Sequence, residues 1–399
     1  MPSVSLILAG LLCTLSCIGG VRADSLATAL DAAWARHPQG AALAARGDEA
    51  TARMALAASL TAGPPSLAFG HLGGGFGQDG GRREWEIELA APLWLPGQQA
   101  ARQREAASGA TVLAATHAAL RLQLAGAVRE AGWAVVAARA ALDLAQQREA
   151  SARALEAGVQ RRHAAGELAR IDANQARSER LAAEAEVADA ATALRGVEHV
   201  WRTLTGLPAP VTIDAERVAD ASGEDPPQLA AAIAALHAAQ ARVQVSRASR
   251  RDPPELALRA VRERDAVAEP WSSQWGVQVR LPFSAGAQTA LNNATAQAEL
   301  AEATAAVEQA RLAHTLDVAR ARAELDAAVQ RDEAAAQRQR LAAESLQLIE
   351  KSFALGESDL ATLLRLRAAA LDADAERAHR RVARTAAVSR LNQALGVLP

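Results

Sequence analysis

Acidic side chains are the residues of this chain that could do chemistry, and their most regular run lies at 84–89. Three glutamates alternate there with Trp85, Ile87 and Leu89, so a strand would place carboxylates on one face and apolar side chains on the other. A catalytic pair needs two carboxylates whose environments separate their pKa values. Equivalent glutamates lack that asymmetry, and the run instead indicates a solvated strand face or the lining of a water-filled pore.

Other chemical signatures are missing from the sequence. The 8 histidines form no His-x-x-x-His pair and lie beside no ligand cluster. No Walker loop, nucleophile elbow or dinucleotide fingerprint occurs. The net charge of −2 gives no electrostatic reason to bind nucleic acid. We therefore expect no enzyme activity, no cofactor, no metal-binding residues and no nucleic-acid partner.

The elements that must position these side chains occur twice. Four residues recur 190 positions later, so that Trp85, Pro92, Gly166 and Gly206 match Trp275, Pro282, Gly356 and Gly396. A constant offset over so much of the chain indicates two structural repeats. Each repeat reads as a helix, two short strands, a very long helix, a glycine break and a returning helix.

The expected helices are unusually long, because strong helix formers such as Ala, Arg, Glu, Gln and Leu dominate the composition. In the first repeat we expect helices at about 25–60, 98–160 and 168–204. In the second we expect two after the strands, at about 287–352 and 359–395. The helix at 98–160 would span on the order of 95 Å. Its apolar positions between 124 and 145 alternate four- and three-residue steps, which is typical of a coiled-coil seam.

The expected strands lie at about 65–72, 84–94, 254–262 and 271–282, and a glycine-rich loop follows the first of them at 73–81. Their alternation fits the wall of an outer-membrane barrel. Four strands cannot close a barrel, since the smallest have about 8, so three chains would have to supply twelve. In such a barrel the lumen residues would be Glu84, Glu86, Glu88 and Gln278. The membrane-facing residues would be Trp85, Ile87, Leu89, Trp275, Val277 and Val279. Trp94 and Trp271 are further candidates for an aromatic girdle.

The segment 1–23 stands apart from both repeats. An apolar run ends in a small-x-small site at Val21–Ala23, which predicts a signal peptide cleaved before Asp24. A buried N-terminal helix is the alternative. Both cysteines, Cys13 and Cys17, lie within this segment, and lipidation of Cys17 is a second way in which it could be processed. No later stretch is apolar enough over about 18 residues to span a membrane as a helix.

Several of these features together resemble a known family. Residues 88–93 form a strand end that contains Pro92, and Arg102 and Arg104 follow it. Residues 162–168 surround Gly166 and precede Asp172. The second half repeats the pattern at 353–358 and 394–396. The chain resembles the outer-membrane efflux protein family, the TolC-like channels. It is most similar to the outer-membrane component of heavy-metal efflux systems of the cobalt–zinc–cadmium type.

The resemblance implies a mainly α fold with a small β part, assembled as a homotrimer. A 12-stranded β-barrel would lie in the outer membrane of a Gram-negative bacterium, on top of a long periplasmic α-helical barrel. The implied divisions are a signal peptide at 1–23, a first repeat at 24–206, a linker at 207–225 and a second repeat at 226–399. The implied partners are outer-membrane lipid, a periplasmic adaptor (membrane fusion) protein and an inner-membrane pump of the RND type.

The resemblance also implies roles for residues near the two glycine breaks. The periplasmic tips that contact the adaptor would be Gly166, Glu167, Leu168, Gly356, Glu357 and Ser358. Asp172, Asp359 and Thr362 would form the entrance constriction. Thr362 departs from the family pattern, which often has an acidic residue at that position. The run 95–98 departs from the Gly-Gly-Lys of the heavy-metal group.

We therefore expect an outer-membrane exit duct of a tripartite efflux system, which conducts substrates passively and has heavy-metal cations among its candidate substrates. Two alternatives remain at this stage. A type I protein-secretion duct would have the same architecture and a different pump. A soluble periplasmic coiled-coil scaffold would leave the alternating strands without a role.

Overall fold

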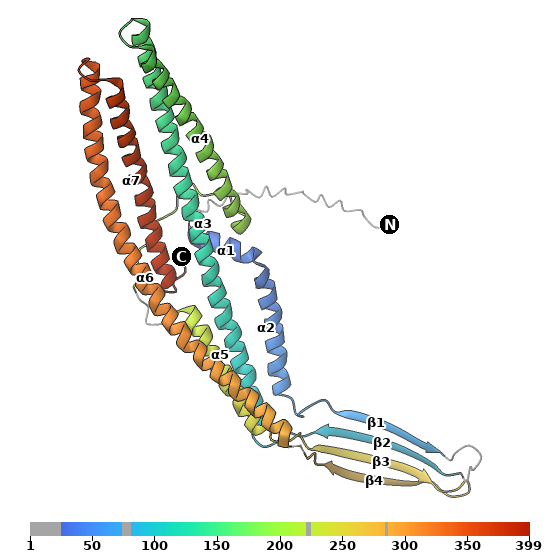
Figure 1. The fold of residues 1–399 in the computed structure, drawn as a ribbon. Coiled ribbons are helices and arrows are strands. Elements are labelled where there is room, and N and C mark those ends of the chain that lie inside the picture. Colours follow the sequence, from blue (N-terminus) through green and yellow to red (C-terminus); the bar gives the residue numbers. More distant parts are fainter. Residues whose placement is uncertain (1–24, 74–80, 221–224, 284–285) are drawn as a thin grey trace, which may run out of the picture.

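The computed structural model describes residues 25–73, 81–220, 225–283 and 286–399. The predicted signal segment, Cys17 and most of the glycine-rich loop lie outside the described residues. The described chain is long and narrow, with helical tips at one end and a β-sheet at the other (Figure 1). The predicted fold class, mainly α with a small sheet, is confirmed.

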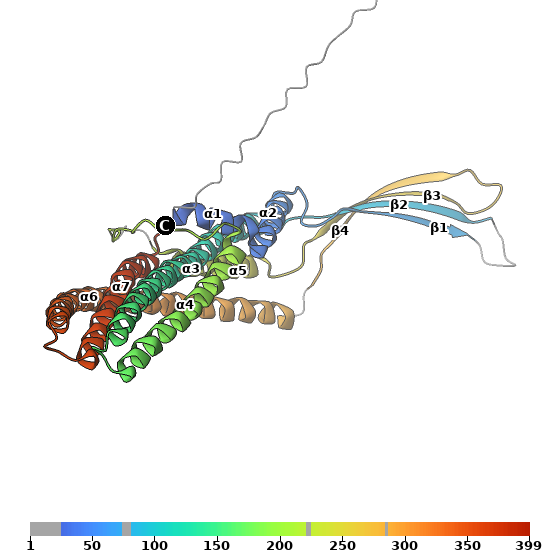
Figure 2. The same ribbon diagram turned by 90° about the horizontal axis from the view of Figure 1, so that it is seen from above.

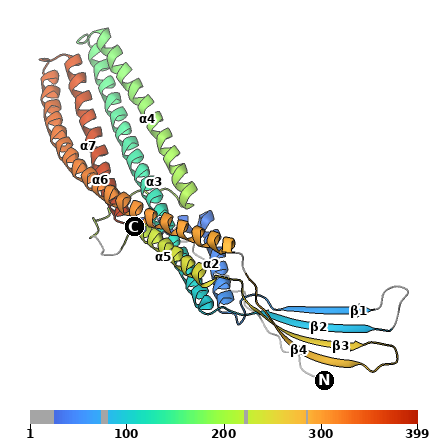
Figure 3. The ribbon, with the colours of Figure 1, turned by 60° about the horizontal axis from the view of Figure 1, so that its bottom comes forward.

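The first repeat contains α1 (Leu26–Arg36), α2 (Pro38–Ala57), β1 (Ser66–Gly73), β2 (Arg83–Pro92), α3 (Gln98–Ala164) and α4 (Arg170–Thr205). The second contains α5 (Pro227–Ala248), β3 (Glu255–Arg264), β4 (Ser272–Arg280), α6 (Gly286–Ala354) and α7 (Leu360–Ala394). Helices α3 and α6 run the length of the helical part, and α4 and α7 fold back along them from the tips (Figure 1). Nearer the sheet, α2 lies beside α3, and α5 lies between α3 and α6 (Figure 3).

The single helix predicted at 25–60 is wrong, because two helices occupy this segment. His37 is extended, with φ −72° and ψ 123°, and Pro38 begins α2. A proline has no backbone N–H to donate, and it disfavours the helical conformation in the residue before it. The chain therefore bends at His37, and α1 turns to pack against α3 and α4.

The strands form one antiparallel sheet in the order β1-β2-β3-β4. The central pairing of β2 with β3 joins the two repeats, with Leu89 opposite Leu258. Figure 2 shows the sheet as a curved single layer that projects away from the helices. In the described part of the chain, no helix covers either face of it.

The helical part is held together by separate apolar clusters along its length. In the middle, α1 inserts Leu30 between α3 and α4, where it meets the buried Val128 and Trp201. At the tips, Val159 of α3 packs with Leu360 and Leu363 of α7. The middle cluster joins α1, α3 and α4, and the tip cluster joins the two long hairpins to each other.

Arg129 is a buried charge beside the middle cluster, with only 2 % of its surface exposed. Its guanidinium donates to Glu216 at 2.6 Å, to the Gln393 side chain at 2.6 Å and to the carbonyl of Val397 at 3.0 Å. These partners lie in the segment between the repeats and at the end of the second repeat. One side chain of α3 therefore joins three distant parts of the chain.

We expect Arg129→Ala to lower the free energy of unfolding by about 3–5 kcal/mol, because it leaves the half-buried Glu216 without its cation. The shift is measured by thermal unfolding of the detergent-solubilised protein. Arg53→Ala removes an arginine whose ion pair with Glu49 is exposed, and it should change stability little. Equal, small effects of both substitutions would contradict this role for Arg129.

Candidate functional site: a two-faced sheet and paired helical tips

The first face of the sheet is polar, and its charges pair across strands. On β2, Glu84, Glu86 and Glu88 lie on one side of the sheet. Arg259 of β3 donates to Glu86 at 2.7 Å. Arg280 of β4 lies 2.7 Å from Glu255 and 4.0 Å from Glu88. The register also places the predicted lumen residue Gln278 on this face, opposite Ala257.

Sequence reasoning missed the arginines of this face. It assigned no role to Arg259 or Arg280. Their opposition to glutamates depends on the register between β2, β3 and β4, which no local pattern reveals. In the folded chain, Glu86, Glu88 and Glu255 lie beside arginines of neighbouring strands.

The opposite face is apolar and exposed. Trp85, Ile87 and Leu89 of β2 are 40–49 % exposed. On β4, Trp275, Val277 and Val279 are 58–85 % exposed. This is the reverse of a sheet in a soluble protein, where apolar side chains meet a core and polar ones meet water. The residues predicted to face a membrane therefore share one continuous face, which is uncovered in the isolated protomer.

The two remaining tryptophans of the strand region differ in their surroundings. Trp94 donates its indole N–H to the carbonyl of Ser59 at 2.9 Å and ties the end of β2 to the segment after α2. Trp271 lies at the far end of the sheet, under the side chains of Arg262 and Arg264. Trp94 is thus part of the joint between sheet and helices, and Trp271 belongs to the opposite rim.

The helical tips repeat one backbone geometry. Gly166 and Gly356 have φ +80° and +78°, a conformation that side chains with a Cβ rarely adopt. The N–H of Glu167 donates to the carbonyl of Arg162, and the N–H of Glu357 donates to that of Ser352, each at 2.9 Å. These are the helix-ending hydrogen bonds of a glycine C-cap. Nothing lies within 4 Å of the position that a Cβ would take at either glycine, so both tips present open space.

The acids beyond the tip glycines cap the returning helices in two different ways. In the first repeat, Asp172 reaches back to accept from the N–H of Ala169 at 3.0 Å. In the second, Asp359 precedes the helix and accepts from the N–H of Thr362 at 2.7 Å. Asp172 and Thr362 are equivalent positions, and so are Ala169 and Asp359. Each returning helix therefore has one acidic cap. The cap of the second repeat, Asp359, lies three positions earlier in its repeat than Asp172 does in the first.

The two tips also touch each other. The guanidinium of Arg162 lies 4.8 Å from the centre of the Phe353 ring of the other hairpin and pairs with Glu167 at 3.1 Å. Leu168 packs into the apolar cluster beneath them. The sequence did not indicate the contact of Arg162 with Phe353, because it joins residues of different repeats.

No cluster of three or more potential metal ligands occurs among the residues that the structure describes. Within the same residues, no helix combines the length and the apolar character that crossing a bilayer requires. The polar face presents paired charges, and the tips present open space at their glycines.

Comparison with known proteins agrees with this picture. Residues 220–397 match the family described as outer membrane efflux protein. The cobalt-zinc-cadmium resistance protein CzcC of Cupriavidus metallidurans is 29 % identical over 208 residues, which are 49 % of each chain. The aligned segment therefore spans about half the length of this curated relative.

Solved structures resemble almost the whole chain. The outer membrane protein VceC of Vibrio cholerae has a TM-score of 0.77 at 17 % identity, and the match covers 93 % of this chain and 96 % of that one. CusC has the same score and identity, with coverage of 93 % and 92 %. The MtrE outer membrane channel of Neisseria gonorrhoeae has a TM-score of 0.71 at 19 % identity, with coverage of 93 % and 89 %.

The predicted resemblance to outer-membrane efflux proteins and to the cobalt–zinc–cadmium group is therefore confirmed. At these identities the solved structures establish the fold. The description of the matched family names the outer membrane, which is the predicted localisation.

The cap at Asp359 generates a prediction about acid sensitivity. Hydrogen bonds from the side chain and backbone N–H of Thr362 hold the pKa of the Asp359 carboxyl below its ordinary value of 3.8. A lowered pKa means that this carboxylate stabilises the fold fully above the ordinary value and ceases to do so as pH falls through the lowered one. The start of α7 should lose its protection only in that acidic range.

Hydrogen exchange of residues 360–363, followed by mass spectrometry, tests this. We expect faster exchange in Asp359→Ala than in the native protein at pH 7, and little change in Asp359→Asn, because asparagine also caps helices. In acid, protection of the native protein relative to the asparagine variant should decline. An alanine variant with native exchange at pH 7 would show that the cap contributes nothing.

Proposed function

We propose, from the resemblance of this chain to the outer membrane efflux protein family and from its channel fold, that it is the outer-membrane exit duct of a tripartite efflux system. Three copies would form the duct. In each, residues 1–23 would be a cleaved signal peptide, with lipidation at Cys17 as the alternative. Residues 24–206 and 226–399 would be the two repeats, joined by the linker at 207–225.

The two-faced sheet is the observation that carries the proposal. Its apolar face needs an apolar environment, and its polar face needs water. Twelve strands from three copies would close a barrel with the paired charges of Glu86 and Arg259 inside, and with Trp85 and Val277 against lipid. Closure would also remove the free edges of β1 and β4, which expose unpaired backbone groups in one protomer.

The proposed mechanism is passive. The long hairpins of three protomers would enclose a tube across the periplasm, and the barrel would continue it through the outer membrane. An inner-membrane pump of the RND type would supply the energy, and an adaptor would join the pump to the tips. The chain itself would have no catalytic residues and no cofactor, since its charged groups serve pairing and capping.

The tips are the proposed adaptor contact. Gly166, Glu167 and Leu168 of one hairpin and Gly356, Glu357 and Ser358 of the other would meet the adaptor. Asp172 and Asp359 would contribute two carboxylates per protomer to the entrance, with Thr362 beside them. Because these acids also cap helices, an entrance role would be additional to a structural one.

Heavy-metal cations are the substrate that we propose, because CzcC is by name a cobalt-zinc-cadmium resistance protein. A duct needs no tight metal site, since conduction requires weak binding. A type I protein-secretion duct is the alternative within the same architecture, and only the partner pump distinguishes it. A soluble periplasmic scaffold is the remaining alternative, and it would leave the apolar sheet face exposed to water.

The first experiment separates these classes. Inner-membrane, outer-membrane and soluble fractions are prepared first. The molar mass of the extracted protein is then measured by light scattering, with the detergent contribution subtracted. We expect a three-chain particle confined to the outer membrane. A monomer or dimer in the soluble fraction would exclude the barrel and favour the scaffold.

A substitution at the second tip tests the docking role. Gly356→Trp should abolish most export while leaving trimers intact, because the side chain projects into open space where the adaptor would sit. Gly356→Asn is the control, since asparagine tolerates a positive φ better than other residues and adds little bulk. Cellular metal accumulation and adaptor pull-down are measured. Normal export and adaptor binding in the tryptophan variant would remove the proposed contact.

A further inference from the structure

Three arginines stand on the apolar face of the sheet, at its end far from the helices. The register places Arg83 of β2 directly opposite Arg264 of β3, and Arg262 opposite Trp85. Arg83, Arg262 and Arg264 therefore share the face of Trp85 and Ile87. Like charges in directly opposed positions of a sheet destabilise the pairing, so this arrangement needs an explanation.

The other face also places two like charges opposite each other, Glu84 and Glu263, but both have partners there, Arg82 and Gln274. Arg259 pairs with Glu86, Arg280 with Glu255, and Arg82 lies 3.9 Å from Glu84. On the apolar face, Arg83, Arg262 and Arg264 have no carboxylate within 4.0 Å in the described part of the chain. The Nε atom of Arg264 is buried and has no hydrogen-bond partner there. Among the described residues, these three arginines of the apolar face thus have no carboxylate to balance them.

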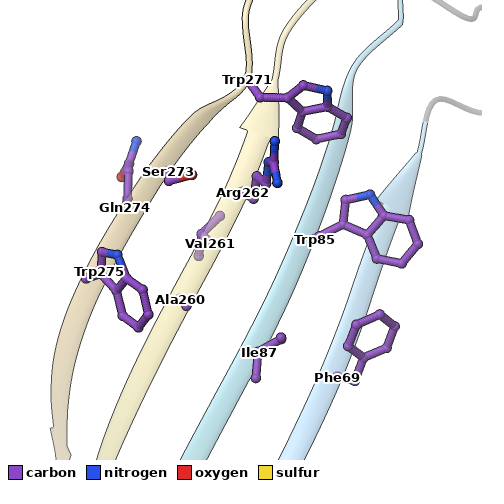
Figure 4. Close-up of a pocket in the computed structure, with 10 residues that line it drawn as sticks. All are labelled: Phe69, Trp85, Ile87, Ala260, Val261, Arg262, Trp271, Ser273, Gln274 and Trp275. Carbon is purple, nitrogen blue, oxygen red and sulfur yellow. The ribbon is translucent and has the colours of Figure 1, made fainter.

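One aromatic ring, that of Trp271, lies against two of these cations. The ring of Trp271 lies 5.5 Å from the guanidinium of Arg262 and 5.1 Å from that of Arg264. Trp271, Arg262, Trp85 and Trp275 line an open hollow of about 550 Å³ on this face (Figure 4). A guanidinium stacked on an aromatic ring keeps its N–H groups free at the edge to bind an anion.

The position of this cluster relates it to the proposed barrel. The leucines and valines of the apolar band, among them Leu89 and Val279, lie toward the helices, and the arginines lie toward the opposite end of the strands. If the proposed function holds, the helices are periplasmic and the arginines lie at the outer membrane–water boundary. Lipid headgroups occupy that depth, and their acyl chains would cover the apolar band.

We propose that Arg83, Arg262, Arg264 and Trp271 form a binding site for the phosphate groups of an anionic lipid in the outer leaflet. Guanidinium groups match phosphate oxygens with paired N–H donors. One phosphate between Arg83 and Arg264 would relieve their repulsion and supply an acceptor for the buried Nε. The tryptophan rings and the hollow beside them would contact the upper part of the lipid. The inference rests on the proposed function, because it needs this face in a membrane.

The test compares two lipids on the full-length protein in detergent. Binding of lipid A with both phosphates, and of the same lipid with its phosphates removed, is measured by native mass spectrometry. We expect the native trimer to bind the phosphorylated form about tenfold or more tightly, as expected for charge-assisted hydrogen bonds. Equal binding of the two lipids overturns the site. The site is also overturned if inorganic phosphate displaces the phosphorylated and the dephosphorylated lipid to the same extent.

Two double variants locate the effect. Arg262→Gln with Arg264→Gln should abolish the preference for the phosphorylated lipid. Arg259→Gln with Arg280→Gln removes the same charge from the same two strands on the other face, and should leave the preference unchanged. Loss of preference in both pairs overturns the assignment to this face. If either double variant gives no trimers, the two-lipid comparison on the native protein decides.

The same material separates this inference from the proposed function. A trimer from the outer membrane that shows no phosphate preference refutes the lipid site and leaves the duct intact. A soluble monomer refutes the duct. Preference for phosphate in that monomer would assign the arginines to a phosphorylated ligand other than a membrane lipid, and would therefore overturn the proposed occupant.

Discussion

The organisation of this molecule depends on one constraint, which is that its sheet is a single layer with neither face covered by a helix in the described chain. Apolar side chains such as Ile87 and Val277 are exposed on one face, while Glu86 and Arg259 pair on the other. Such a sheet is stable only between lipid and water or against copies of itself. The proposed barrel of several copies would account for the curvature of the sheet and for its unpaired outer edges.

In the helical part, the very long hairpins must be held in alignment. Helices of this length pack mainly through small side chains, and the seams are narrow. Two fixed points compensate for this. The cluster around Trp201, together with buried Arg129, ties the middle of α3 to the linker and to the end of α7. At the tips, Arg162 and Phe353 hold one hairpin against the other.

The pairing of charged residues on the sheet depends on which face they occupy. Arginines that face water on the sheet are paired with glutamates, and arginines that share a face with tryptophans are not. The tip acids Asp172 and Asp359 are engaged by helix ends. Among the arginines of the described strands, those without a carboxylate partner lie at the outer rim of the apolar face.

Local patterns were sufficient to predict much of this structure. Period-two alternation at 84–89 marks a two-faced strand, and helix-forming composition marks the long helices. Glycine at 166 and 356 marks turns that need a positive φ. The break at His37 could also have been predicted, because Pro38 acts on its neighbour. Only the tertiary structure decided the pairing of Arg259 with Glu86, the opposition of Arg83 and Arg264, and the contact of Arg162 with Phe353. These contacts join segments far apart in sequence, so their register follows from packing of the whole chain and leaves no trace in any local period.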